Sequence, residues 1–135
     1  MILYYLEEVL FEGIDQNDGE RIEIRIGQGF WVNKRKLDLC KRKISKSLGS
    51  GWSLVVTKFK MQISKRQKYL YILNFEYYLD DGTCCFYQFE PQTSIFKCNE
   101  QKKNLQKETK YADDPKRIYK VGKGGWFVDK LEIVY

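Results

Sequence analysis

Residues 21–26, RIEIRI, decide the fold of this chain, because charged side chains and isoleucines alternate along them without a break. Successive side chains of a β-strand point to opposite faces of the sheet, so this period of two predicts a strand with its isoleucines buried on one face. The β-branched isoleucines also favour extended backbone. The sequence therefore predicts a sheet, and these residues are its most clearly marked strand.

The segment before this strand predicts its partner. Residues 3–11 are rich in leucine, tyrosine and other apolar residues, and residues 15–19, DQNDG, end in the Asp-Gly pair that suits a tight hairpin turn. The three leucines of residues 3–11 also fit the spacing of a helix. The turn residues and the aromatic content favour a β-hairpin.

The apolar residues change their period in the next segment. They recur at intervals of three and four, which predicts one stripe of an amphipathic helix over residues 34–48. Gly49 then follows as a helix stop. The members of the stripe are Leu37, Cys40, Ile44 and Leu48.

Strand-forming residues dominate the rest of the chain. Further strands are predicted at 54–63, 69–79, 83–89 and 126–135, with Asp80-Asp81-Gly82 as a hairpin turn. We therefore expect an α+β fold, a mostly antiparallel sheet of about five to seven strands with one main amphipathic basic helix, residues 34–48, packed on it.

Length and composition predict a single domain over residues 1–135. Residues 99–116 contain few apolar side chains and are expected to form an exposed loop or a frayed helix. No apolar run reaches the length of a membrane-spanning helix and no basic leader precedes an apolar stretch. We therefore expect an intracellular, reducing location in the cytoplasm, where the four cysteines act as small apolar residues.

The composition argues against most catalytic chemistry. The chain has no histidine, which excludes catalytic triads, histidine acid–base catalysis and histidine zinc sites. The four cysteines include no CxxC pair, so no metal site and no cofactor is predicted. Paired carboxylates remain open as a catalytic alternative, because the chain has 18 Asp and Glu residues. We expect a protein that is not an enzyme.

Charge divides the chain into three parts. Residues 1–33 hold two basic and seven acidic side chains, a net charge of −5. Residues 34–68 hold twelve basic and one acidic, a net charge of +11, whereas residues 69–135 hold ten of each. The basic excess of the whole chain therefore lies in residues 34–68.

This basic segment predicts a binding surface for a polyanion. Lysine and arginine contacts to phosphates release counterions and give salt-sensitive binding to nucleic acid, DNA or RNA. Glycines also precede each tryptophan closely, so Trp31 and Trp52 are candidates for rings that stack on bases or anchor a partner, and the alternative is that each ring covers the edge of the core. The candidate basic residues are Lys34, Arg35, Lys36, Lys41, Arg42, Lys43, Lys46, Lys58, Lys60, Lys65 and Arg66.

Two functions fit these observations. The first is a small binding module that uses residues 34–68 as a surface for the nucleic-acid backbone or another polyanion. The alternative is a protein-interaction module, a small inhibitor or a subunit of a larger assembly, that meets an acidic protein surface. The acidic residues 1–33 also allow a salt-sensitive homodimer in which they face residues 34–68 of a second copy.

Overall fold

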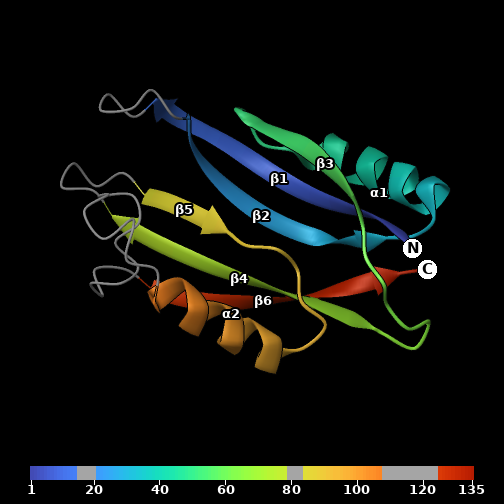
Figure 1. The fold of residues 1–135 in the computed structure, drawn as a ribbon. Coiled ribbons are helices and arrows are strands. Elements are labelled where there is room, and N and C mark those ends of the chain that lie inside the picture. Colours follow the sequence, from blue (N-terminus) through green and yellow to red (C-terminus); the bar gives the residue numbers. More distant parts are fainter. Residues whose placement is uncertain (15–20, 79–83, 108–124) are drawn as a thin grey trace. The chain divides into compact units, whose positions relative to one another are not determined.

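The computed structural model describes residues 1–14, 21–78, 84–107 and 125–135 (Figure 1). These residues form six strands and two helices, and the sheet is mixed, which confirms an α+β fold. The elements in chain order are β1 (Ile2–Ile14), β2 (Arg21–Trp31), α1 (Lys34–Ser47), β3 (Trp52–Lys60), β4 (Tyr69–Tyr78), β5 (Cys84–Gln88), α2 (Ile95–Lys107) and β6 (Gly125–Val134).

The chain divides into two compact units. Unit 1 contains Met1–Leu70 and Leu131–Tyr135, and unit 2 contains Tyr71–Lys130. The prediction that residues 1–135 form a single domain stays a prediction.

The sheet of unit 1 is built on β1, which pairs antiparallel with β2 on one side and with β3 on the other. Tyr4 lies opposite Trp31 in β2 and opposite Lys58 in β3. The predicted hairpin partners are therefore confirmed, and the helical alternative for residues 3–11 is wrong. The predicted turn at residues 15–19 lies outside the described residues.

One strand pair is parallel, so the sheet is mixed, whereas the sequence predicted a mostly antiparallel sheet. The end of β6 runs parallel to β2, with Phe30 opposite Ile133 and Trp31 opposite Val134. A tight turn cannot join parallel strands, so no local turn residues mark this pair in the sequence. The pairing also joins segments about a hundred residues apart, which periodicity within one segment cannot reveal.

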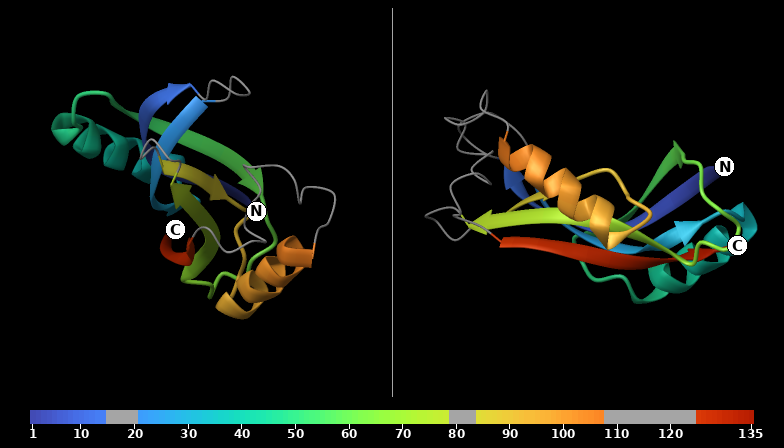
Figure 2. Two further views of the ribbon diagram at one scale, coloured as in Figure 1. Left: turned by 90° about the vertical axis from the view of Figure 1, so that its left-hand side faces the viewer. Right: turned by 60° about the horizontal axis from the view of Figure 1, so that its bottom comes forward.

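Helix α1 packs on one face of unit 1 (Figure 2). Leu37 is 2 % exposed and joins Leu6 and Trp31 in a buried cluster. Cys40 and Ile44 pack against the same cluster. The predicted helix and its apolar stripe are confirmed, apart from Leu48, which lies at the cap position just after the last turn.

The start of α1 is fixed by Asn33. Its side-chain oxygen accepts hydrogen bonds from the backbone N–H groups of Arg35 at 3.0 Å and Lys36 at 3.3 Å. Such a cap satisfies two of the four N–H groups that the first turn of a helix leaves without a helical partner.

Unit 2 contains the antiparallel pair β4 and β5, the helix α2 and the first part of β6. Phe75 is fully buried and packs against Tyr87, Phe89, Leu105 and Trp126. The predicted turn at residues 80–82 lies outside the described residues.

A second helix was not predicted as such. Helix α2 begins at Ile95 and ends at Lys107, so the described part of residues 99–116 is helical, and residues 108–116 lie outside the described residues. Cys98 is the one side chain of α2 that is buried. A helix with so little apolar surface facing the core gives a weak periodic pattern, which explains why the sequence left a loop and a frayed helix as alternatives.

Candidate nucleic-acid interface

Three basic segments of unit 1 meet at one end of its sheet. They are the start of α1, the last residues of β3 and the turn at residues 64–67. Helix α1 begins three residues after Trp31, and Trp31 and Lys58 lie on either side of Tyr4 in neighbouring strands. Neighbouring strands are about 4.8 Å apart, so Lys58 lies only about 10 Å from the strand that leads into α1. Residues opposite each other in an antiparallel pair share a face, so Lys58 lies on the face that α1 covers.

Tyr135 joins the third segment, the turn at residues 64–67, to the start of α1. The ammonium group of Lys36 donates a hydrogen bond to the main-chain oxygen of Tyr135. The hydroxyl of Tyr135 lies 2.7 Å from the carbonyl oxygen of Gln67 and 3.3 Å from that of Ser64. One residue therefore connects the first turn of the helix with residues 64–67.

These residues form a turn that presents two cations. The backbone N–H of Gln67 donates to the carbonyl oxygen of Ser64 at 2.9 Å, and the N–H of Arg66 donates to the hydroxyl of Ser64 at 3.1 Å. Lys65 and Arg66 are the two central residues of this turn, and both side chains are exposed. The turn holds their backbone fixed while their charged ends reach solvent.

We call the exposed cations of these three segments the basic end surface. Each of the six is exposed, and among residues 1–14, 21–78, 84–107 and 125–135 none of them forms an ion pair. Unpaired cations from separate segments add their fields in one place and attract a polyanion. The basic end surface consists of Lys34, Arg35, Lys58, Lys60, Lys65 and Arg66.

A second set of cations follows α1 away from this end. Lys41, Arg42 and Lys46 line an open hollow of about 570 Å³ together with Asp38 and Ser45. We call Lys41, Arg42, Lys43 and Lys46 the outer helix surface. A helix rises about 1.5 Å per residue, so Lys46 lies about 18 Å along the helix from Lys34. The predicted basic residues thus form two groups, and Lys36 is engaged with Tyr135.

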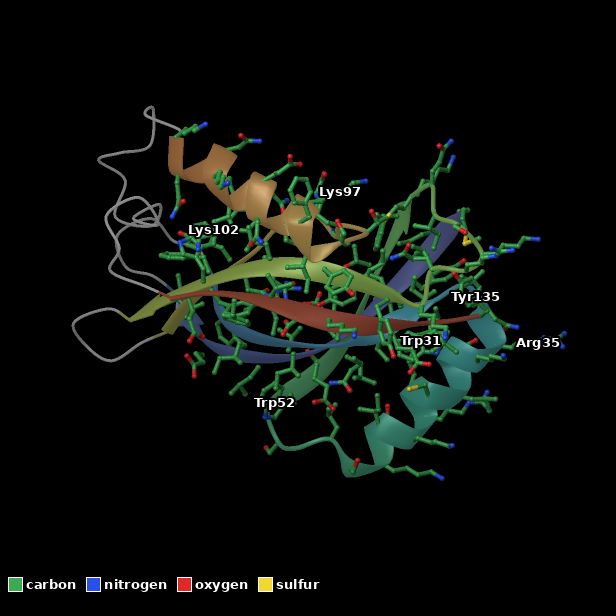
Figure 3. The ribbon with its side chains drawn as sticks, turned by 90° about the horizontal axis from the view of Figure 1, so that it is seen from below. Trp31, Arg35, Trp52, Lys97, Lys102 and Tyr135 are labelled. Carbon is green, nitrogen blue, oxygen red and sulfur yellow. The ribbon has the colours of Figure 1, made fainter. Side chains whose placement is uncertain are left out.

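The two predicted tryptophans lie away from the basic end surface or beneath it. Trp31 is 6 % exposed and belongs to the buried cluster of Leu6 and Leu37, which agrees with the alternative that its ring covers the core. Trp52 is half-buried at the start of β3, beside Gly49. Figure 3 shows Arg35 and Tyr135 at one end of α1 and Trp52 at the other.

Tyr135 is the residue of this site that the sequence did not single out. It was predicted only as the last residue of a strand. Its contacts to Lys36 and Gln67 span 99 and 68 residues of chain. No pattern within one segment marks such a residue.

Part of the acidic charge of residues 1–33 is satisfied within unit 1. Arg25 forms ion pairs with Glu7 at 3.0 Å and with Glu23 at 2.8 Å. Glu7 is also 2 % exposed. These two carboxylates are therefore poorly placed to face a second copy, and the homodimer stays a prediction.

Two groups of unit 2 have shifted pKa values. Burial raises the pKa of Asp129, and the hydrogen bond that its carboxylate accepts from Asn74 at 3.1 Å opposes this rise. Burial also raises the pKa of the Cys98 thiol, which makes it a poorer nucleophile. Within the described ranges of the chain, no three His, Cys, Asp or Glu side chains gather in a way that could hold a metal ion.

Comparison of the chain with protein families, with curated proteins and with solved structures finds no match. Neither helix that the structure describes is long and apolar enough to cross a membrane.

Proposed function

We propose that unit 1 is a non-enzymatic binding module that holds the phosphate backbone of nucleic acid on the basic end surface. The observation that carries this proposal is the convergence of six exposed cations from α1, β3 and the turn at residues 64–67, none of which forms an ion pair with another described residue. Cations of this kind neutralise backbone phosphates and release the counterions that surround them, which favours binding. The outer helix surface extends the positive field along α1 and steers the polyanion toward this end.

The salt dependence of binding is the first test. A fluorescently labelled strand and a duplex are titrated with the protein at rising salt, and binding is followed by anisotropy. Six cations set an upper limit on the slope of log Kobs against log salt of about −4 for a single strand and about −5 for a duplex. Absence of binding at low salt, or binding that does not change with salt, contradicts the proposal.

Two charge-reversed variants with the same net charge locate the surface. The first changes Lys34, Arg35, Lys65 and Arg66 to Glu, and the second changes Lys41, Arg42, Lys43 and Lys46 to Glu. All eight lie off the buried stripe of α1, so each substitution changes the free energy of unfolding by only about 0.5 kcal/mol.

The first variant is expected to lose roughly 100-fold or more in affinity. It should also lower the magnitude of the salt slope for a single strand by about 3, because each of the four lost phosphate contacts removes about 0.7. The second is expected to lose less than roughly 10-fold, because it removes only long-range attraction. Equal losses in the two variants show that only net charge matters and contradict the assignment of the site. An acidic protein surface is the partner that remains if nucleic acid does not bind at all.

A further inference from the structure

An aromatic residue beside the basic end surface, Tyr135, is held in place by hydrogen bonds. Tyr135 keeps 38 % of its surface exposed. Its hydroxyl is nevertheless anchored to the turn that carries Lys65 and Arg66, and its main-chain oxygen accepts a hydrogen bond from Lys36. The side chain is therefore anchored at its hydroxyl to the turn that carries Lys65 and Arg66, its main chain contacts the start of α1, and the residue as a whole is not buried.

Such an arrangement fits unpaired bases better than a duplex. Proteins that bind single strands combine cations along the backbone with aromatic rings on which bases stack. The bases of a duplex are already stacked on each other and present only their edges and the phosphates. A ring that is fixed before binding also loses little conformational freedom when a base stacks on it.

We infer that Tyr135 is a stacking site for an unpaired base of single-stranded nucleic acid, with Lys65 and Arg66 on one side and Lys34 and Arg35 on the other holding the flanking phosphates. This inference rests on the proposed function, because it needs the basic end surface to bind the backbone. It adds a ligand class, the unpaired base, and a residue that charge alone does not select.

The test compares two ligands that differ only in their bases. One is a thymidine oligomer of about 12 nucleotides, within the usual site size of such proteins. The other is an abasic oligomer of the same length, which keeps the phosphates. The wild-type protein is expected to bind the thymidine oligomer roughly 5- to 150-fold more tightly, the factor that corresponds to stacking of one base.

Two variants of Tyr135 separate the ring from its hydroxyl. Tyr135→Leu and Tyr135→Phe both lose the hydrogen bond to Gln67, and only Tyr135→Phe keeps a ring. Tyr135→Phe is expected to retain the preference for bases, whereas Tyr135→Leu is expected to bind both oligomers within about twofold of each other. Phe11→Leu is the matched control, because Phe11 is 44 % exposed but lies opposite Glu23, and it should leave the preference unchanged.

The outcomes distinguish the inference from the proposed function. Wild-type protein that binds the abasic and thymidine oligomers equally, with salt dependence intact, overturns the stacking site and leaves the backbone surface standing. Loss of the base preference in Tyr135→Phe but not in the control shows that the hydroxyl and not the ring is responsible, and it also overturns the stacking site. The same comparison with uridine oligomers distinguishes RNA from DNA: preference for bases in either sugar supports the inference, and absence in both overturns it.

Discussion

Leu37→Ala removes the side chain that anchors α1 to unit 1. Leu37 is 2 % exposed and lies in one buried cluster with Leu6 and Trp31. The substitution deletes three carbon atoms from this cluster, which costs about 2.4 kcal/mol at roughly 0.8 kcal/mol per buried methylene. The cavity that remains adds to this cost, so we expect a loss of about 3 to 4 kcal/mol in the free energy of unfolding.

Ile44→Ala is the comparison on the same face of α1. Ile44 packs on this cluster but is only half-buried, so its truncation leaves a site that water can fill. We expect a loss of about 1 to 2 kcal/mol, smaller than the 2 to 5 kcal/mol that a fully buried isoleucine costs. The difference between the two changes in the free energy of unfolding shows how much each end of the stripe contributes to the packing of α1.

Urea unfolding followed by circular dichroism provides the measurement. Both variants should lower the urea concentration at the midpoint of unfolding while the slope m stays constant. A constant m shows that only stability has changed, whereas a changed m indicates altered compactness or loss of two-state unfolding. A cost below about 1 kcal/mol for Leu37→Ala, or equal costs for the two variants, refutes the burial of Leu37 as the main anchor of α1.

Asp129 in unit 2, and the glycines Gly51 in unit 1 and Gly125 in unit 2, give two further predictions. Because the pKa of Asp129 is raised in the folded state, its carboxylate binds a proton more tightly there than in the unfolded chain. The wild-type protein should therefore gain stability relative to Asp129→Asn as the pH falls from the raised pKa toward about 4. Urea unfolding measures this difference in stability, and a difference that stays constant with pH excludes the effect. Gly51→Ala should cost about 1 to 2 kcal/mol of stability, because Gly51 has a φ of 84° that residues with a side chain disfavour. Gly125→Ala should change stability by less than about 0.5 kcal/mol, because a Cβ there meets nothing within 4 Å. Equal melting temperatures of the two variants contradict this expectation.

Local patterns in the sequence predicted the elements better than their partners. The alternation at residues 21–26 and the stripe of Leu37, Cys40 and Ile44 each lie within one segment, and the structure has β2 and α1 at these places. The parallel pairing of Trp31 with Val134 depends on two distant segments. Helix α2 buries only Cys98 and therefore has little periodicity to detect.

The candidate site shows the same division between composition and geometry. Counting charges identified residues 34–68 as the basic segment, but the grouping of Lys58 and Arg66 with the start of α1 depends on strand pairing and on the hydrogen bonds of Tyr135. The burial of Trp31 likewise depends on contacts with Leu6 and Leu37 that no local pattern contains.

The charges at the start of α1 are also unfavourable for the helix itself. Lys34, Arg35 and Lys36 occupy the first turn, which holds no acidic residue, and the positive end of the helix dipole repels cations there by about 0.3 to 1 kcal/mol each. Asn33 already satisfies the exposed N–H groups of Arg35 and Lys36, so these side chains add nothing to the cap. Lys36 gains a contact with Tyr135, but Lys34 and Arg35 gain no ion pair from the described residues. Residues that break a local rule without a structural gain are expected at functional sites, and this supports the proposed binding surface, on which helix stability and binding oppose each other.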